Sequence, residues 1–432
     1  MKVSISGVRG IFGNDLSLKD VIHYCRNFSS LIQSKKCVVG RDTRPSGEIT
    51  SNAAIASLLE RGISVYNLGI APTPVIFREA RKYGAGLIIT SSHNPLEWNG
   101  LKFILEGRGI NESELEQLLK ERQFKRGKFG VEKEVNSSYI DEAANLIGKI
   151  NKSPKIAIDV GGGAAFEVAP QLLKKLGCKT SVINQTPDTS TRGPDPTNDK
   201  LSDLIQSSKK VDIGFAFDLD GDRLVLVKDG MKKSPDVTLG LGIAGALEKG
   251  YKKFVLSIDT SVAIEKFITQ RGGLVHRSKV GEANVVDMML KTKSQAGGEG
   301  SSAGFILPEF NMCRDGILTS GLVASMVGTK QFDEIIKFME GYHQVRTKVS
   351  VDSKFHKKTL EILLKKMKKQ SSQIVTIDGI KSIIDEDSWV LVRQSNTEHI
   401  IRVSAESNDL NKAKSIEKQI SNLLKQSYEE SR

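Results

Sequence analysis

The sequence predicts an α/β protein with three tandem α/β domains, built on mixed sheets, and a smaller C-terminal α+β domain. A short β-branched apolar run that ends in a small or acidic cluster and leads into a helical pattern occurs at 37–42, 156–161 and 254–259. Such runs are typical of buried strands, and their alternation with helices indicates α/β layers. With 432 residues, the chain is long enough for three or four domains. Further strand-like runs lie at 63–69, 86–90, 101–105 and 211–217.

The domain boundaries follow from these repeats and from a polar stretch at 151–154 that separates the first two units. After the third unit the order changes, because a helical pattern at 354–370 precedes strand-like segments at 388–393 and 400–405 and a final helical stretch at 409–427. This order is typical of an α+β module. The expected domains are 1–148, 151–248, 250–345 and 346–432.

The composition is that of an ordinary globular protein, with 39% hydrophobic and 26% charged residues. No stretch approaches the ~20 consecutive apolar residues of a transmembrane helix, so no membrane partner is expected. The N-terminus lacks a signal-peptide pattern, which makes a cytoplasmic location the expectation. Cys25, Cys37, Cys178 and Cys313 form no CxxC motif and have no histidine at metal spacing. They are expected to be reduced thiols and not zinc ligands.

The net charge of +12 has three interpretations. A nucleic-acid partner is one, but the lysines are scattered and no aromatic platform or zinc finger accompanies them, so none is expected. A solvated charged face is the plainest interpretation, for example around 365–369. A basic cleft that attracts a dianionic substrate is the third.

The strongest local motif is a set of three alternating aspartates, Asp218, Asp220 and Asp222, at the end of the apolar run 211–217. Carboxylates so close together repel unless a cation holds them, and all-oxygen ligands favour Mg²⁺ or Ca²⁺. An EF-hand does not fit, because glycine occupies the fourth loop position instead of the sixth. A polar hairpin turn is the structural alternative. The motif predicts a metal site with room for a further oxygen, such as that of a phosphate.

A second motif is the pair Ser92 and His93, which follows the strand-like run 86–90 within the sequence Ser-Ser-His-Asn-Pro. A serine and a histidine after a strand can serve as nucleophile and base. The G-x-S-x-G pattern of a hydrolase elbow is absent. By itself, the pair is compatible with an ordinary capped turn.

Three weaker motifs complete the set. The segment 392–398, with Arg402 nearby, combines arginine with hydroxyl and amide donors, as a phosphate cradle does, although a polar hairpin loop has a similar composition. The glycine-rich segment 297–304 carries one carboxylate and two hydroxyls, which suit sugar hydroxyls or a plain linker. Arg9 and Arg44 each stand in a short glycine-containing segment and can be structural arginines.

Together and in this order, these motifs resemble those of the α-D-phosphohexomutase family. Ser-His-Asn-Pro, Asp-x-Asp-x-Asp-Arg and Arg-x-Ser-Asn-Thr fall in the family's order and approximate spacing, and the resemblance covers essentially the whole chain. The family includes phosphoglucomutase/phosphomannomutase and phosphoglucosamine mutase. The resemblance implies a heart-shaped molecule of four domains around a central cleft that holds the site.

The resemblance also implies a role for each motif. Ser92 matches the serine that carries the phosphoryl group, and Asp218, Asp220 and Asp222 match the Mg²⁺ ligands, with the serine phosphate completing the metal site. The residues matched to acid–base and electrostatic roles are Arg9, His93 and Lys102. Those matched to substrate binding are Arg223 after the metal loop, Lys279, Glu299 and Ser301 at the sugar, and Arg393, Ser395, Asn396, Thr397 and Arg402 at the non-reacting phosphate.

The implied reaction interconverts hexose 6-phosphate and hexose 1-phosphate through phosphorylated Ser92 and a bisphosphorylated sugar that turns over within the cleft. Such a transfer depends on positioning and on neutralised charge. The expected partner is therefore a small phosphosugar, with hexose bisphosphate as intermediate and activator, and the expected assembly is a monomer or a homodimer.

The segment 297–304 departs from the family pattern, because many members read Gly-Glu-x-Ser-Gly-His and this chain has no histidine there. The selectivity for the hexose is open for that reason. The stretches 5–10 and 98–102 look like the phosphoglucosamine mutase branch, which ranks that substrate first and glucose or mannose phosphate next. Two other classes stay open, a Mg²⁺-dependent phosphatase and a non-catalytic sugar-phosphate or nucleic-acid binder. The binder would not need both Ser92 and three metal ligands.

Overall fold

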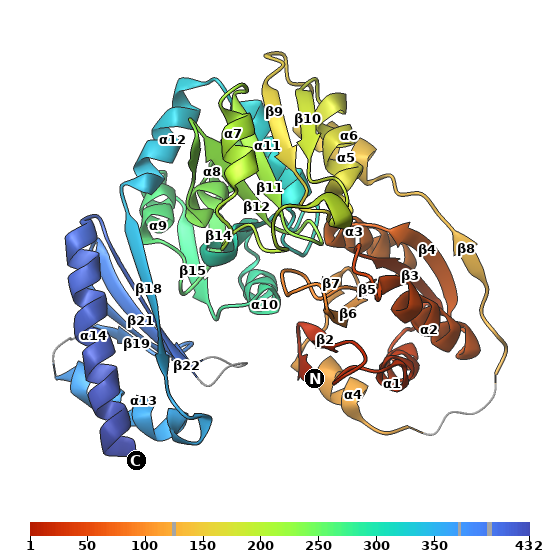
Figure 1. Cartoon of the computed structure of the whole chain (residues 1–432), viewed down its shortest axis with the longest axis horizontal. Helices are drawn as coiled ribbons and strands as arrows, with labels where there is room; N and C mark the ends of the chain where they lie inside the picture. The colour runs from red at the N-terminus through yellow and green to blue at the C-terminus, as the bar shows by residue number, and fades with distance from the viewer. Residues whose placement is uncertain (123–126, 370–372, 395–399) are drawn as a thin grey trace.

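The computed structural model describes residues 1–122, 127–369, 373–394 and 400–432. Among these residues, four β-sheets follow one another along the chain, each with helices packed against it. The four units form an arc, with the first and the fourth at its two ends (Figure 1). This arrangement confirms the predicted class of three α/β units followed by a smaller α+β unit.

The first unit is built on a mixed sheet. Its strands are β1 (Lys2–Ser4), β2 (Gly7–Ile11), β3 (Lys36–Arg41), β4 (Ser64–Ile70), β5 (Ala85–Ile89), β6 (Trp98–Leu105), β7 (Arg108–Gly109) and β8 (Glu132–Glu134). Its helices are α1 (Leu18–Ser29), α2 (Gly47–Glu60), α3 (Thr73–Tyr83), α4 (Glu112–Leu119) and α5 (Tyr139–Ile147). Strand β3 runs parallel to β4 and β5, whereas β6 is antiparallel to β5 and β2. The predicted strands of this unit are β3, β4, β5 and the second half of β6.

The second unit carries its chemistry in the turn of a hairpin. Its strands are β9 (Lys155–Asp159), β10 (Lys179–Ile183), β11 (Ile213–Phe217), β12 (Leu224–Lys228) and β13 (Met231–Lys232), in the order β10-β9-β11-β12-β13. Its helices are η1 (Ala164–Phe166), α6 (Val168–Lys175), η2 (Pro187–Thr189) and α7 (Ser202–Ser208). Strand β11 is fully buried, as its unbroken apolar sequence predicts, and pairs antiparallel with β12. The three aspartates lie in the turn between these two strands.

The third unit has the strand order β15-β14-β16-β17. Its strands are β14 (Lys253–Ser257), β15 (Leu274–Ser278), β16 (Ala296–Glu299) and β17 (Gly304–Ile306). Its helices are α8 (Pro235–Glu248), α9 (Val262–Thr269), α10 (Glu282–Thr292), η3 (Gly300–Ser302), α11 (Gly316–Met326) and α12 (Lys330–Glu340). Helix α8 packs against β12 of the second sheet as well as against β16 and β17. Helix α8 therefore contacts the sheets of two units. The domain boundaries expected from the sequence stay a prediction.

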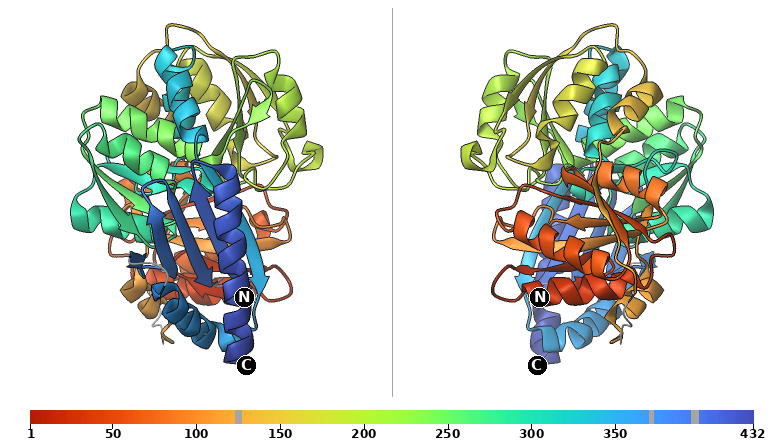
Figure 2. Two further views of the ribbon diagram at one scale, coloured as in Figure 1. Left: turned by 90° about the vertical axis from the view of Figure 1, so that its left-hand side faces the viewer. Right: turned by 90° about the vertical axis from the view of Figure 1, so that its right-hand side faces the viewer.

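The fourth unit is an antiparallel sheet in the order β18-β22-β21-β20-β19. Its elements are β18 (His343–Ser350), η4 (Ser353–Phe355), α13 (His356–Lys368), β19 (Ile374–Val375), β20 (Ile380–Asp385), β21 (Ser388–Gln394), β22 (Ile400–Ser407) and α14 (Leu410–Ser431). Helix α14 runs along one face of the sheet, over β18 and β22, as the left view of Figure 2 shows. The sequence predicted helices α13 and α14 and strands β21 and β22, but not strands β18, β19 or β20.

The core is divided unevenly between the units. Ile88 of the first sheet, Phe215 of the second and Leu256 of the third belong to one continuous apolar cluster. The fourth unit has a core of its own. A small apolar cluster links it to the third unit, made by Ile258, Trp389 and Leu391. The first three units are therefore one packed body, to which the fourth is attached through a small interface.

The cysteines are all buried, and none forms a disulfide. Burial raises the pKa of each of these thiols, so they stay protonated at neutral pH. This agrees with the expectation of reduced, structural thiols. Within the described residues, no helix combines the length and the apolar character needed to cross a membrane.

Candidate active site

A cleft of about 1020 Å³ is lined by residues of all four units. Sequence-predicted residues that are distant in the chain come together here: Arg9, Ser92, His93, Lys102, Arg223, Glu299, Ser301, Arg393 and Arg402. The two ends of the arc in Figure 1 thus supply opposite walls of one cleft.

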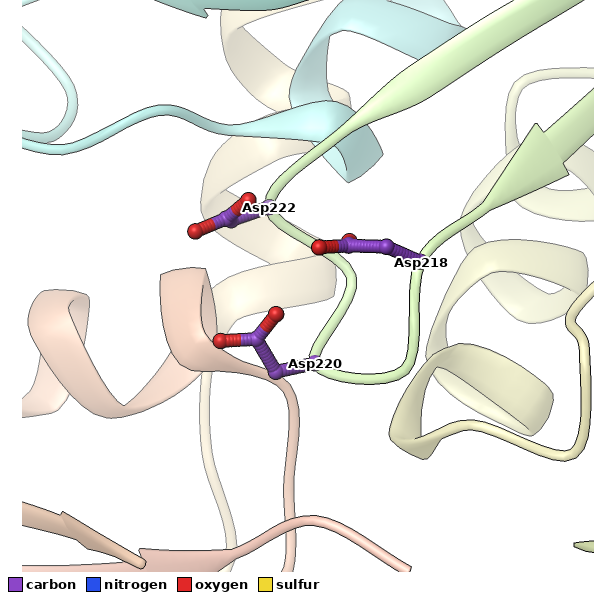
Figure 3. A group of neighbouring side chains, drawn as sticks. All are labelled: Asp218, Asp220 and Asp222. Carbon is purple, nitrogen blue, oxygen red and sulfur yellow. The ribbon is translucent and has the colours of Figure 1, made fainter. Parts of the chain in front are cut away.

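Asp218, Asp220 and Asp222, which we name the carboxylate triad, are buried in the turn between β11 and β12. One ligand oxygen from each lies within 4.8 Å of the others. Figure 3 shows the three side chains pointing into one space. Burial, followed by the nearby charges of Asp222 and Asp220, raises the pKa of Asp218 well above its ordinary value. Three carboxylates in this arrangement repel one another, and a bound cation would offset that repulsion.

The free oxygen atoms of the triad fit a metal ion. Asp220 Oδ2 accepts hydrogen bonds from Thr73 Oγ1 at 2.8 Å and from Lys102 Nζ at 2.7 Å. Asp220 Oδ1 and Asp222 Oδ1, in contrast, are buried and have no hydrogen-bond partner. A buried carboxylate oxygen without a partner is costly unless something else compensates it. All-oxygen donor sets suit hard divalent cations, so the triad can bind a metal of this kind.

Ser92 lies beside the triad, in the loop that leads from β5 to β6. Its Oγ is 3.3 Å from Asp218 Oδ2 and 3.4 Å from Nδ1 of His93. Its φ of +53° is in the left-handed region, which non-glycine residues rarely adopt. Such a conformation persists only where the surroundings fix it, and it often accompanies function.

Arg44 supplies that fixation. Its side chain is fully buried and pairs with Asp42 at 3.0 Å. The guanidinium also donates to the backbone carbonyls of Ser92 at 2.5 Å and Asn94 at 2.7 Å, and further to those of Pro95 and Trp98. One arginine therefore satisfies three carbonyls of residues 90–97, which we name the serine loop, and one at the start of β6. Arg44 is thus a structural arginine, as its sequence context allowed.

His93 is held by Arg223, the residue that follows the triad. Nδ1 of His93 accepts a hydrogen bond from Arg223 Nη2 at 2.9 Å, because a guanidinium can only donate. Burial, and then the neighbouring Arg223, lower the pKa of His93 to about 2. The imidazole is therefore neutral at physiological pH. Asp195, from a loop of the second unit, accepts from Arg223 Nη1 at 3.2 Å and holds the guanidinium from the other side.

Lys102 crosses from the first unit to the triad. Its Nζ is 2.7 Å from Asp220 Oδ2 and 3.5 Å from Asp222 Oδ2. Burial works to lower the pKa of Lys102, but the two aspartates outweigh it, so the ammonium stays charged. Arg9 in β2 lines the same wall and donates to the Ser6 carbonyl.

The segment 297–304, which we name the sugar loop, presents Glu299 and Ser301 to the cleft. Glu299 is buried, and its Oε1 accepts from the backbone N–H of Gly281 at 2.5 Å. Lys279, which the sequence placed at the sugar, is exposed in this structure and does not line the described cleft, although Val280 does. The role of Lys279 at the sugar stays a prediction.

The fourth sheet forms a basic wall. Side chains alternate between the two faces of a strand, so Val392 and Val403 enter the core while Arg393 and Arg402 point to the cleft as cross-strand neighbours. Arg346 and Lys348 of β18 join the same wall. Ser395, Asn396 and Thr397 lie outside the described residues.

Models of four protein-family domains match the chain in order. They are described as phosphoglucomutase/phosphomannomutase alpha/beta/alpha domains I, II and III, which match residues 1–129, 137–230 and 234–342, and the C-terminal domain, which matches 347–423. The chain belongs to this family of phosphosugar mutases.

Similar proteins span the whole length of this family member. A probable phosphoglucosamine mutase of Methanobrevibacter smithii is 31% identical over 98% of each chain. A phosphoglucomutase/phosphomannomutase of Thermococcus kodakarensis is 34% identical over 94% of this chain and 95% of its own. A solved structure of a phosphoglucomutase/phosphomannomutase family protein from Burkholderia thailandensis has 25% identity and a TM-score of 0.86, and covers 99% of this chain and 98% of its own.

Several site residues of this mutase carry no motif and were not found from the sequence. They are Thr73, Asp195, Glu282, Arg314, Arg346 and Lys348. Only β18 offered a signal, because Arg346 and Lys348 are spaced two residues apart, as neighbours on one face of a strand are. The others are single residues that packing brings to the site.

Replacing Arg44 by Met is expected to destabilise the protein strongly. The change leaves the Asp42 carboxylate buried and unpaired, and breaking such a pair costs about 3–5 kcal/mol. The free energy of unfolding, measured with denaturant, checks this. Arg26→Met is the matched control, because it removes a surface ion pair with Glu60 in the same unit, and a pair of this kind is worth about 1 kcal/mol or less. Equal costs for the two variants would contradict the role of Arg44.

Proposed function

We propose that this protein interconverts the 6-phosphate and the 1-phosphate of a hexose through a phosphoryl group carried on Ser92, and that glucosamine phosphate is its substrate. The observation that supports this most directly is the position of Ser92. Its Oγ lies 3.3 Å from the carboxylate triad, in a cleft whose opposite wall carries Arg393 and Arg402. A cleft that binds a sugar with two phosphates requires one end where a phosphoryl group reacts and another end that holds the second phosphate.

In the proposed reaction, the bond between phosphorus and Ser92 Oγ breaks while a bond to a sugar hydroxyl oxygen forms. The proton of that hydroxyl passes to a basic group of the cleft. The resulting bisphosphate turns over, and the bond between its other phosphorus and the sugar oxygen breaks while a bond to Ser92 Oγ forms. The sugar oxygen takes the proton back from the basic group, so the enzyme ends as it began. Phosphoryl transfer of this type depends on positioning and charge stabilisation more than on covalent assistance.

The carboxylate triad would hold Mg²⁺, and a bound Mg²⁺ neutralises charge on the transferring group. Lys102 would add positive charge to the same region from the first unit. His93, kept neutral and hydrogen-bonded to Arg223, would order the serine loop and the polar surface around Ser92. Water is disfavoured there because Ser92 and the triad are buried.

At the far wall, Arg393 and Arg402 would bind the phosphate that is not being transferred. Guanidinium groups bind phosphate through paired, charge-assisted hydrogen bonds. Ser395, Asn396 and Thr397 stay predicted members of this phosphate-binding loop. Glu299 and Ser301 would contact the sugar hydroxyls between the two ends.

The names of the relatives support two sugars. Several relatives at 31–34% identity are named probable phosphoglucosamine mutase, which favours glucosamine phosphate. The Thermococcus kodakarensis relative named phosphoglucomutase/phosphomannomutase, at 34%, supports glucose or mannose phosphate as the second candidate. A coupled assay with all three hexose phosphates and a bisphosphate activator decides between them. Release of free phosphate without isomerisation would favour the phosphatase alternative and contradict the proposal.

Ser92→Ala is expected to abolish mutase turnover and to remove the added mass of the active protein. A serine phosphate adds about 80 Da, which intact mass spectrometry resolves. Ser91→Ala is the matched control, because the neighbouring hydroxyl is buried without a hydrogen-bond partner and should keep both the mass and the activity. Full turnover in Ser92→Ala would refute the phosphoserine route.

Removal of the metal is expected to stop the reaction. Chelator-treated protein should regain activity with Mg²⁺, and Asp220→Asn should bind Mg²⁺ at least about tenfold more weakly, because one ligand charge is lost. Isothermal titration measures this affinity without reference to turnover. Asp236→Asn, a change at a buried aspartate outside the triad, should bind as the parent does. Undiminished turnover in the presence of chelator would contradict the proposal.

Arg393→Ala is expected to lower kcat/KM by about tenfold to a hundredfold while leaving the phosphorylation of Ser92 intact. A charge-assisted contact of this kind is worth about 1.5–3 kcal/mol. Steady-state kinetics, intact mass and thermal stability are measured on one preparation. Lys366→Ala is the control, because it removes an ion pair with Glu430 in the same unit. If Arg393→Ala lowers the melting temperature and leaves kcat/KM unchanged, Arg393 only stabilises the sheet.

A further inference from the structure

Arg314 forms ion pairs with carboxylates from separate segments of the site, and it belongs to none of the sequence motifs. It stands in the segment before α11, and its guanidinium reaches three carboxylates. Nη2 is 2.7 Å from Asp222 Oδ2 of the triad, and Nη1 is 3.1 Å from Glu299 Oε2 of the sugar loop. Nε is 3.4 Å from Glu282 Oε2 at the start of α10. One side chain thus spans the second and the third unit.

This arginine is largely enclosed at the edge of the cleft, next to the three carboxylates. Its side chain is 11% exposed, and it lines the cleft. A guanidinium keeps its proton in proteins, so Arg314 meets these three carboxylates as a cation. Without it, three carboxylates would lie close together with much of their charge uncompensated.

The sugar loop makes room for this side chain. Gly304 in β17 pairs directly with Glu299 in β16. A Cβ atom at position 304 would lie 2.2 Å from Cδ of Arg314, which is far too close for any two carbon atoms. The strand therefore accommodates the stem of Arg314 only because it has glycine at this position.

The two oxygens of Glu299 show what Arg314 achieves. Oε1 is fixed by the N–H of Gly281, and Oε2 is fixed by Arg314. The same guanidinium holds Oδ2 of Asp222 while Oδ1 stays without a partner. Arg314 thus joins Glu299, a carboxylate that lines the cleft, to the triad beside Ser92.

We infer that Arg314 is a positioning residue that keeps Glu299 in register with the carboxylate triad, so that the sugar hydroxyl meets the phosphoryl group on Ser92 in a reactive geometry. This inference rests on the proposed mutase function. The contacts of Arg314 would affect the rate of the chemical step strongly, because a displacement of the reacting groups by about 1 Å can lower that rate about a hundredfold.

Arg314→Gln should lower kcat by about tenfold to a hundredfold and change KM for the hexose phosphate by less than about threefold, because the anchoring phosphate is bound at the other wall. Binding of Mn²⁺, measured by calorimetry on the same protein, should be as tight as in the parent or tighter, because the change removes a competing positive charge.

Two further variants separate positioning from stability. Gly304→Ala keeps Arg314 but displaces it, and should reproduce the fall in kcat. The double variant Arg314→Gln/Glu299→Gln should be about as slow as the slower single variant, because both changes disrupt one unit. Arg78→Gln is the control, since Arg78 also bridges two parts of the chain, through Glu142 and the Phe310 carbonyl, and does not line the cleft. It should lower stability and leave kcat unchanged.

Three results would overturn the inference: parental kcat in Arg314→Gln or in Gly304→Ala, multiplicative losses in the double variant, or a loss of Mn²⁺ binding that parallels the loss of turnover. An inactive parent protein would instead count against the proposed function. The two failures are distinguishable, because the variants are compared only with a parent that turns over.

Discussion

Charge compensation between units is the constraint on which this structure depends. The carboxylate triad comes from the second unit and is buried next to two more carboxylates, Glu282 and Glu299, of the third. Arg223 of the second unit lies 3.8 Å from Asp218, and the cations nearest to the triad come from the other two units: Lys102 from the first and Arg314 from the third. Breaking a buried pair by removing one partner costs about 3–5 kcal/mol. The three units are thus stable around this site only in the arrangement that brings both cations to the acidic cluster.

The apolar core is distributed in the same way as the charged groups of the site. The first three units share one apolar cluster, and the site's buried charges lie where these units meet. The fourth unit has its own core and touches the third through Ile258, Trp389 and a few polar contacts, such as that of Glu406 with the Val262 N–H. Groups that need tight geometry are thus placed in the common body. The long, charged side chains for which we propose phosphate binding lie on the separately packed sheet.

The sequence allowed prediction of what is local and not of what packing assembles. Asp218, Asp220 and Asp222 were recognisable because a single turn brings them together after a buried strand. Arg314 was not, because its partners lie 92, 32 and 15 residues away, in three different segments. Strand β18 was missed because its sequence is mostly polar, and its strand conformation comes from pairing with β22 along its whole length.

The two walls of the cleft have opposite character, and this has a consequence for the proposed turnover of a bisphosphate. The wall of the fourth sheet carries four basic side chains, Arg346, Lys348, Arg393 and Arg402, of which Arg393 is paired with Asp378 at 2.8 Å. The wall beside Ser92 is anionic at the triad and becomes attractive to a phosphate only with a metal ion and Lys102 in place. In the proposed mechanism, each phosphate of the intermediate would therefore meet positive charge at either end, whichever way the sugar lies. Paired hydrogen bonds from arginine recognise the phosphate group itself and not one end of the sugar, so the proposed intermediate would be able to exchange its ends within the cleft.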